Sequence, residues 1–439
     1  MVFQKKIIFS FFMNKNKIKE LYRNYNYYIN YAILVLINGC TSVLNYVSSI
    51  YINRSLSISD FAYYNGIINI YLIIILTVSS FSYYIMHNYE NEEDAKRYWA
   101  YGYLIAIIIF VGFVFSIPLI DILFNIKKYK ALFIISIAIF ISVFTIVSQS
   151  ILKINNYIGY DYCASFIASF IGKIILLAIF IITGLTLEKA IISLFAFCII
   201  YFAIHVFELK KKNLPYYTNI KNIKKYFSVK DLSEFKNYII NVVIINFIFN
   251  WVSLNDVLMA NRYLDKTSAG YYSTMALIIK MFFYIGTPIA AVMFSYILIS
   301  MKNKNKDKER KVLYYSIILY FLGSLFLSAF LIIFAKQIIL TQFAERYESI
   351  IPLIPKAALF GFSLGFAVLT FNYGLAYKLF YPFYGYLIIF AYVYFSLRNG
   401  ERTFERFIFI MAMFYLVLFI YNILILTFHR IFFNYKNRS

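Results

Sequence analysis

The sequence has few charged residues and few of the side chains that most enzyme sites use. Only 14% of its 439 residues are charged, whereas an ordinary soluble domain has about 25%, so a water-soluble globular fold is excluded. Its three cysteines have neither disulfide-like nor metal-like spacing. Its three histidines, at 87, 205 and 429, stand at predicted helix ends and form no ligand cluster. No glycine-rich phosphate loop is present, so the chain is not by itself an ATP-driven pump.

Apolar runs make up most of the chain. Hydrophobic residues account for 62% of it, and the mean hydropathy is +0.72. A membrane-spanning helix needs about 20 apolar residues. The runs predict an all-α integral membrane protein with about twelve transmembrane helices, over residues 29–52, 65–86, 100–124, 131–152, 157–183, 187–208, 237–260, 269–299, 312–335, 350–374, 379–397 and 404–428.

The longest polar connection, 209–236, divides the chain into six helices and six. We therefore expect an N-terminal lobe over 29–208 and a C-terminal lobe over 237–428. Residues 1–28 form a basic N-terminal segment and 429–439 a tail. The apolar patch near the start is too short to span a membrane, and translation from Met1 or from Met13 is equally compatible with the sequence.

The net charge of +22 comes mostly from lysines and arginines between the apolar segments. If the N-terminus is cytoplasmic, the inner segments hold more than twice as many Lys and Arg residues as the outer connections. Cytoplasmic loops of membrane proteins carry such an excess. The pattern predicts a multi-pass protein of the cell (inner) membrane with both termini and the basic loop 209–236 in the cytoplasm. The bilayer, not nucleic acid, accounts for the positive charge.

An internal repeat appears at an offset of 208 residues. NRSLSISDFAYY at 53–64 aligns with NRYLDKTSAGYY at 261–272, with Asn, Arg, Leu and two Tyr residues identical. Arg54 and Arg262 stand at matching outer helix ends, where they can cap carbonyls or meet lipid headgroups. Because each half has an even number of helices, the two copies share one orientation. This is the parallel repeat of some transporters.

The helix before each copy carries a polar stripe. Its members are Asn38, Ser42 and Asn45 in the first copy and Asn246, Asn250 and Ser253 in the second. The spacing i, i+4, i+7 puts each set on one helix face. Polar faces of membrane helices turn to the bundle interior or to water. We expect a cavity between the lobes, and we predict that the four asparagines bind substrate.

Two lysines and one aspartate lie inside predicted spans. Lys173 and Lys280 are both roughly 15 Å below the outer end of their helices, counting about 1.5 Å per residue. A lysine near the bilayer centre costs about 2.5–3.5 kcal/mol. Two cations at similar depth suit an anionic headgroup, and a structural ion pair is the alternative. Asp256 could pair with Lys280, bind a coupling cation or lie at the outer interface.

Two stretches resemble the polysaccharide or oligosaccharide (Wzx-type) flippases of the multidrug/oligosaccharidyl-lipid/polysaccharide exporter superfamily. NRSLSISDFAYYNGIINIY at 53–71 is similar to that family's R-x-L-S-x-x-x-F-G-x-Y, although Ala62 replaces the glycine. NDVLMANRYLDKTSAGYYSTMALIIK at 255–280 is similar to its Asp-led seventh-helix end. By position, Asp256, Gly270, Tyr272 and Lys280 match this second motif. Lys173 is an addition from the residues alone.

The resemblance implies alternating access of two six-helix lobes around a central cavity. The implied substrate is a polyprenyl-diphosphate-linked oligosaccharide, moved to the outer leaflet for a surface polysaccharide such as O-antigen, with other assembly proteins as partners. We expect neither enzymatic activity nor a cofactor or metal. Two alternatives remain. One is a cation-coupled drug or metabolite antiporter of the same superfamily, and the other is a polytopic polysaccharide polymerase or glycosyltransferase.

The charge distribution leads to a topology prediction. A cysteine placed in loop 209–236 should resist an impermeant thiol reagent in intact cells and react once the membrane is permeabilised, because the basic loop is cytoplasmic. A cysteine at Ser59, in the first outer connection, serves as the positive control. Labelling of the loop in intact cells would contradict the topology.

Overall fold

The computed structural model describes residues 37, 39–155, 157–217, 229–302, 304–377, 379, 381–400 and 402–435. This part of the chain is helical and contains no strand. In the N-terminal half, residues 39–55 form a helix. It is followed by α3 (Ile58–Val78), α4 (Ser80–Asn88), α5 (Glu92–Phe124), α6 (Tyr129–Ile154), α7 (Ile158–Ser169), the π-helical segment η1 (Phe170–Ile175), α8 (Leu176–Ile182) and α9 (Leu187–Lys211).

The C-terminal half repeats this pattern with more interruptions. Its elements are α10 (Val229–Leu254), α11 (Asp256–Tyr263), α12 (Lys266–Lys302), α13 (Lys306–Ile333), α14 (Ala335–Ile338), η3 (Ile339–Phe343), η4 (Glu345–Leu353), α15 (Ile354–Ala376), η5 (Tyr381–Tyr384), α16 (Gly385–Arg398) and α17 (Phe404–Tyr435).

The predicted all-α membrane fold is confirmed. Within the described residues, nine helices are long and apolar enough to cross a membrane, and the bent pair α10–α11 makes a tenth. The helix at 39–55 and the shorter α16 stand where the two remaining spans are predicted. The predicted span starts at 65 and 100 are wrong as helix boundaries. Helix α3 begins at Ile58 after the N-cap Ser57, and α5 begins at Glu92 with a capping box from Asn91 and Asp94.

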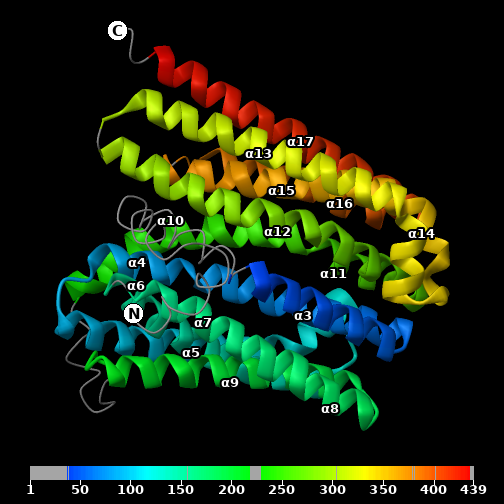
Figure 1. Ribbon diagram of the computed structural model, residues 1–439, viewed down its shortest axis with the longest axis horizontal. Coiled ribbons are helices and arrows are strands. Elements are labelled where there is room, and N and C mark those ends of the chain that lie inside the picture. The colour runs from blue at the N-terminus through cyan, green and yellow to red at the C-terminus, as the bar shows by residue number, and fades with distance from the viewer. Residues whose placement is uncertain are drawn as a thin grey trace, which may run out of the picture.

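The helices form two groups that meet along α3 and α12 (Figure 1). The N-terminal helices up to α9 occupy one side of the molecule, and α12 to α17 occupy the other. Helix α10 lies between the groups and packs on α3 and α4 as well as on α16. The arrangement is two six-helix lobes related by a parallel repeat.

Small residues bring α12 and α15 into close contact. A Cβ atom added to Gly286 would lie 2.9 Å from the carbonyl oxygen of Gly365 on the opposite helix. Membrane helices associate through such close backbone approach, because lipid provides no hydrophobic drive between them. This contact ties the eighth helix to the tenth and fixes the face that α12 turns toward the N-terminal lobe.

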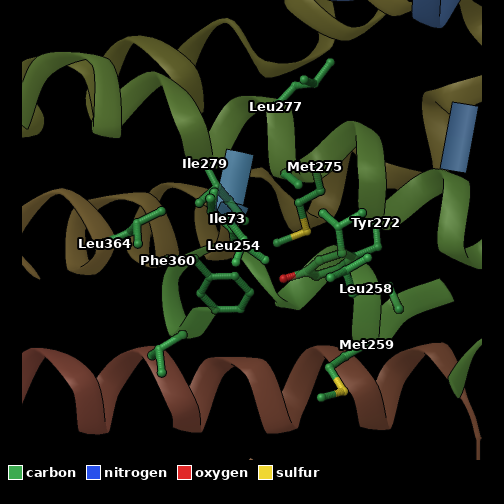
Figure 2. Close-up of a cluster of buried hydrophobic side chains, with 14 of the residues drawn as sticks. Ile73, Leu254, Leu258, Met259, Tyr272, Met275, Leu277, Ile279, Phe360 and Leu364 are labelled. Atoms are coloured by element: carbon green, nitrogen blue, oxygen red, sulfur yellow. The ribbon is translucent and has the colours of Figure 1, made fainter. Parts of the chain in front are cut away.

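The seventh span is broken. Helices α10 and α11 meet at an angle of 52° around Asn255. At this break the Leu254 carbonyl accepts a hydrogen bond from a side chain outside the helix. The bend is packed by a buried apolar cluster that includes Leu254, Leu258, Met275 and Phe360 (Figure 2). Four elements therefore converge at the bend, which makes it a rigid point of the C-terminal lobe.

We expect Gly286→Ala to destabilise the protein, because its Cβ would meet backbone that cannot move aside. Overpacking of this kind typically costs about 1–3 kcal/mol. Gly112→Ala is the matched control, since a Cβ there meets nothing within 4 Å. Thermal unfolding in detergent measures both variants. Equal melting temperatures for the two would contradict the close α12–α15 contact.

Candidate functional site

Lys280 joins the two lobes. Its Nζ donates to Asn69 Oδ1 at 2.8 Å, from α12 of one lobe to α3 of the other. Asn69 is fully buried, and its Nδ2 donates to the Leu254 carbonyl at 2.9 Å, which is the carbonyl left by the break before α11. One asparagine therefore satisfies both a membrane-level ammonium and an interrupted helix end.

Lys173 has an equivalent neutral partner in the N-terminal lobe. Its Nζ donates to Asn45 Oδ1 at 2.9 Å and lies 4.2 Å from the centre of the Phe197 ring. It stands in the π-helical segment η1, and such wide turns are frequent at functional sites. A Cβ added to Gly172 would lie 2.7 Å from the backbone nitrogen of Phe197, so η1 packs tightly on α9.

Among the described residues, no carboxylate lies within ion-pair distance of either lysine, although Asp256 attracts Lys280 from farther away. The side-chain ion pairs among the described residues involve Asp60, Asp94 and Asp161, and none includes Lys173 or Lys280. Both lysines are half-buried and hydrogen-bonded to neutral amides. Buried charges are normally paired, so half-buried ammonium groups whose hydrogen-bond partners are neutral amides are unusual.

Asp256 is a buried hydrogen-bond acceptor at the start of α11. Its Oδ2 accepts the hydroxyl hydrogens of Tyr272 at 3.0 Å and Tyr415 at 3.1 Å, and its Oδ1 accepts the Val257 amide at 2.8 Å. It thus ties α11 to α12 and α17. Its carboxylate is not within ion-pair distance of Lys280, but the two charges still attract each other.

The polar stripe of the seventh span faces the protein interior. Asn246, Asn250 and Ser253 are all buried, and Asn246 Nδ2 donates to the Val242 carbonyl of its own helix. In the first copy of the repeat, Asn45 contacts Lys173 as described above, whereas Asn38 lies outside the described residues. Sequence reasoning missed Asn69. The sequence feature that could have identified Asn69 is its position one helical turn after Asn65 in an otherwise apolar segment.

Asparagines of the repeat cross from lobe to lobe in both directions. Asn53 Nδ2 donates to Thr274 Oγ1 at 2.8 Å, and Asn261 Nδ2 donates to the Ala62 carbonyl at 3.0 Å. These two asparagines are the identical residues that open the two repeat copies. The interface is therefore built from matching contacts of the two lobes.

The axis that relates the lobes passes between α3 and α12. Asn65 Nδ2 donates to the Ser273 carbonyl at 2.9 Å, and these two residues are 208 positions apart. Positions equivalent in the repeat thus touch one another, as they must at a two-fold axis. Beside them, a Cβ on Gly270 would collide with the Ile58 side chain and carbonyl. Glycine at this motif position is required by the close approach of the two lobes.

Two arginines donate hydrogen bonds to backbone carbonyls of the opposite lobe. Arg346 donates to the carbonyls of Asn53, Arg54 and Leu56, the last at 2.8 Å, so it caps the C-terminus of the first helix from the other lobe. Arg54 donates to the Thr341 carbonyl at 3.1 Å. Arg262 is exposed. Arg346 was not singled out from the sequence, because a loop arginine is indistinguishable there from an orientation charge.

The cross-lobe contacts described above gather between the outer ends of the helices and the level of Lys280. Two buried polar atoms in this zone have no hydrogen-bond partner in the structure, namely Asn261 Oδ1 and Ser273 Oγ. Buried polar atoms are rarely left unpaired in a permanent core.

The sequence profile of the family described as polysaccharide biosynthesis protein matches residues 51–352, which is more than half of the chain. The chain belongs to the polysaccharide biosynthesis protein family. The resemblance drawn from the two motifs is thereby confirmed. No curated protein sequence matches.

Among solved structures, the chain is similar to the inward-facing conformation of a multidrug resistance MATE family transporter of the MOP superfamily. The TM-score is 0.69 at 16% identity, covering 93% of this chain and 99% of that one. It is also similar to the lipid II flippase MurJ in an inward closed conformation. There the TM-score is 0.67 at 16% identity, covering 91% and 87%. The chain thus has the fold of these multi-pass membrane transporters.

The outer contacts predict a specific cross-link. In a chain whose three cysteines are replaced by serine, Asn53→Cys together with Thr274→Cys should be joined by a short bifunctional thiol reagent, because the native side-chain tips are 2.8 Å apart. Mass spectrometry of the joined peptides in native membranes provides the measurement. The two single variants are controls. Absence of a cross-link while both thiols remain reactive would contradict the closed outer end.

Proposed function

We propose that this protein is a flippase that moves a polyprenyl-diphosphate-linked oligosaccharide from the cytoplasmic to the outer leaflet by alternating access. Membership of a polysaccharide biosynthesis family supports a role in surface glycan assembly. The fold shared with a lipid II flippase supports movement of a lipid-linked substrate. The proposal places the protein in the cytoplasmic membrane with both termini inside and assigns it no catalytic step.

The observation that carries the proposal is the pair of lysines whose hydrogen-bond partners are neutral amides. A diphosphate offers several negatively charged oxygens, and hydrogen bonds between charged groups are roughly twice as strong as neutral ones. At about 4 Å and an effective dielectric constant near 20, two unit charges attract by about 4 kcal/mol before desolvation. A diphosphate therefore displaces Asn69 from Lys280 and Asn45 from Lys173.

Substrate binding then acts on the lobe interface. The Lys280–Asn69 bond spans the two lobes. When a phosphate binds the Lys280 ammonium in place of Asn69, Asn69 keeps only its hydrogen bond to the Leu254 carbonyl. This second bond also spans the lobes. Loss of one of these paired bonds lowers the cost of separating α3 from α12. Binding energy is thereby spent on the conformational change that transport needs.

A cation-coupled drug or metabolite antiporter is the second candidate, favoured by the similarity to a MATE family transporter. Such an exporter should carry an acid inside the first helix, and the predicted span 29–52 contains none. A polymerase or glycosyltransferase should carry acid clusters in its outer loops. The first outer connection has only Asp60, which is paired with Lys128 at 3.0 Å.

Substitution of Lys280 tests the site. We expect Lys280→Ala to lower glycan export at least about tenfold, equivalent to about 1.4 kcal/mol, and Lys280→Arg to retain part of it. Lys173→Ala should act in the same direction, and the exposed Lys336 provides a neutral control. Surface glycan and lipid-linked repeat are both quantified, because a blocked flippase accumulates the latter inside.

The structural alternative gives a different result. If Lys280 only holds α12 to α3, Lys280→Ala should lower the protein level, and Lys280→Gln should restore both level and export through an amide–amide bond to Asn69. Normal abundance and normal export in both Lys280→Ala and Lys173→Ala would refute the lysine site.

A further inference from the structure

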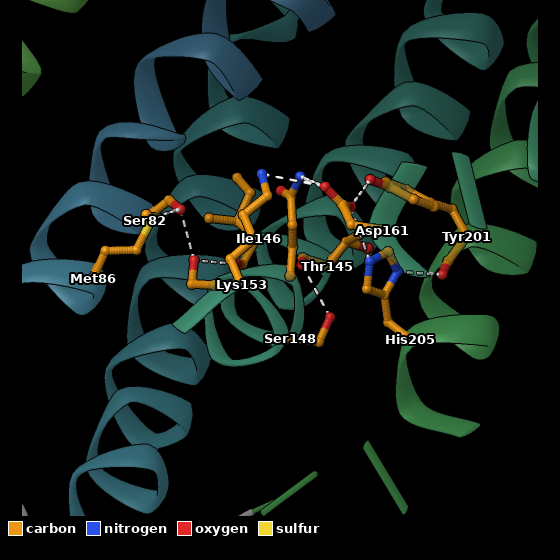
Figure 3. A network of polar contacts seen from close by, with 11 residues as sticks. Ser82, Met86, Thr145, Ile146, Ser148, Lys153, Asp161, Tyr201 and His205 are labelled. Carbon is orange, nitrogen blue, oxygen red and sulfur yellow. Dashed lines mark hydrogen bonds and ion pairs between the residues drawn. The ribbon is translucent and has the colours of Figure 1, made fainter. Parts of the chain in front are cut away.

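A second polar cluster joins helices α6, α7 and α9 of the N-terminal lobe (Figure 3). At its centre Asp161, on the first turn of α7, is 2% exposed. Its Oδ2 accepts from Gln149 Nε2 at 2.8 Å and from Lys153 Nζ at 3.2 Å, both on α6. Its Oδ1 accepts the Tyr201 hydroxyl at 2.6 Å and faces His205 Nε2 at 3.1 Å, both on α9.

The contacts of His205 require an additional proton. Its Nδ1 lies 2.8 Å from the Tyr201 carbonyl, which can only accept, so Nδ1 carries a hydrogen. Its Nε2 faces Asp161 Oδ1, and two lone pairs cannot face each other at 3.1 Å. One more proton therefore lies between Nε2 and Oδ1, whichever atom holds it. If that proton leaves, the contact between His205 Nε2 and Asp161 Oδ1 becomes repulsive, and only the Tyr201 hydroxyl still holds Asp161 to α9.

The surroundings contain charges of both signs. Lys153 on α6 is the cation in contact with Asp161, and Tyr162 follows the carboxylate on α7 itself. One turn beyond His205, Glu208 on α9 has a buried Oε2 without a partner. Lys212 lies over the rings of Tyr157 and Tyr160 near the start of α7. On α3, Tyr71 faces Tyr201.

The cluster is connected to the proposed substrate site by one continuous helix. Asp161 lies on α7, which continues through η1, where Lys173 contacts Asn45. Twelve residues separate the aspartate from the lysine, or about 18 Å of helix. The first turn of α7 is held to α6 and α9 through the Asp161 carboxylate. A change in these contacts of Asp161 therefore moves the helix that carries Lys173.

We propose that Asp161 and His205 form a proton-binding site whose occupancy sets the position of α7 and, through it, of Lys173. With the proton bound, α7 is held as in this structure, with the outer ends of the lobes joined. Loss of the proton to water at the inner side releases the start of α7. Proton binding itself needs no lipid substrate, and only its effect on Lys173 rests on the proposed function.

Histidine is the side chain that exchanges a proton within the physiological pH range. The last helix of the other lobe provides a natural comparison, because His429 also lies at its inner end. Its Nδ1 contacts the Tyr373 hydroxyl at 2.7 Å. A hydroxyl can donate or accept, so this bond does not demand a second proton on the ring. His429→Gln is therefore the matched control for His205→Gln.

Distances between spin labels on the two lobes test the proposal in the full chain. Labels at the exposed positions Ile182 and Ile333 report on the outer ends, and labels at Met86 and Tyr315 report on the inner ends. In bilayers without substrate, we expect the short outer distance to dominate near pH 6 and to lose population near pH 8.5. A single coupled proton changes the ratio of two conformations by up to about tenfold per pH unit.

Two histidine variants test whether His205 is the source of this pH response. We expect His205→Gln to abolish the pH response and His429→Gln to retain it. A wild-type distance that is independent of pH, or a His205→Gln response equal to wild type, would overturn the proposal. If His429→Gln lost the pH response while His205→Gln retained it, the proton would bind in the C-terminal lobe, and the proposal would likewise be overturned. A normal pH response in a protein that fails every glycan export assay would refute the transport proposal and leave the proton site standing.

A measurement on the native pair guards against misfolding of the variants. With His87→Gln and His429→Gln, His205 is the only imidazole, and solid-state ¹⁵N spectra in bilayers report hydrogens on each of its nitrogens. Infrared spectra report protonation of the Asp161 carboxyl. We expect the pair to lose one proton between about pH 6 and pH 8.5. A proton count that stays constant over this range would refute the site.

Discussion

The structure depends on one chain of buried hydrogen bonds, which runs from the Lys280 ammonium through the Asn69 amide to the Leu254 carbonyl. Within a bilayer no water is available to satisfy an ammonium or an interrupted helix end. Asn69 serves both groups, and it belongs to the opposite lobe. The requirement to satisfy these groups therefore holds the two lobes together at the depth where a phosphate would bind.

The repeat explains why the outer contact is reciprocal. Asn53 and Asn261 are equivalent, and each reaches into the partner lobe. A parallel repeat presents the same helix ends on the same side of the membrane, so one recurring motif builds both halves of the contact. Short polar bonds, beside two unpaired polar atoms, make this contact easier to open than an apolar core.

Two kinds of charge are buried in different ways. Lys173 and Lys280 donate hydrogen bonds to neutral amides, whereas Asp161 is surrounded by donors, among them Lys153 and His205. The first arrangement suits a ligand that comes and goes. The second suits a fixed group whose only exchangeable component is a proton. One continuous helix, α7 with η1 and α8, carries both Asp161 and Lys173, so the proton and the anion of the two proposals would act on the same element.

From the sequence alone, the membrane class, about twelve spans and the repeat could be predicted, because hydropathy and periodicity are local properties of the chain. It did not place Asn69, Arg346 or the Asp161–His205 pair. Each of these side chains has its role through a partner on a helix that is far away in sequence. Only the packing of the helices determines which partner that is. Tertiary structure also supplied the hydrogen-bond partners of Asp256, two tyrosine hydroxyls from α12 and α17, which its position in the sequence did not indicate.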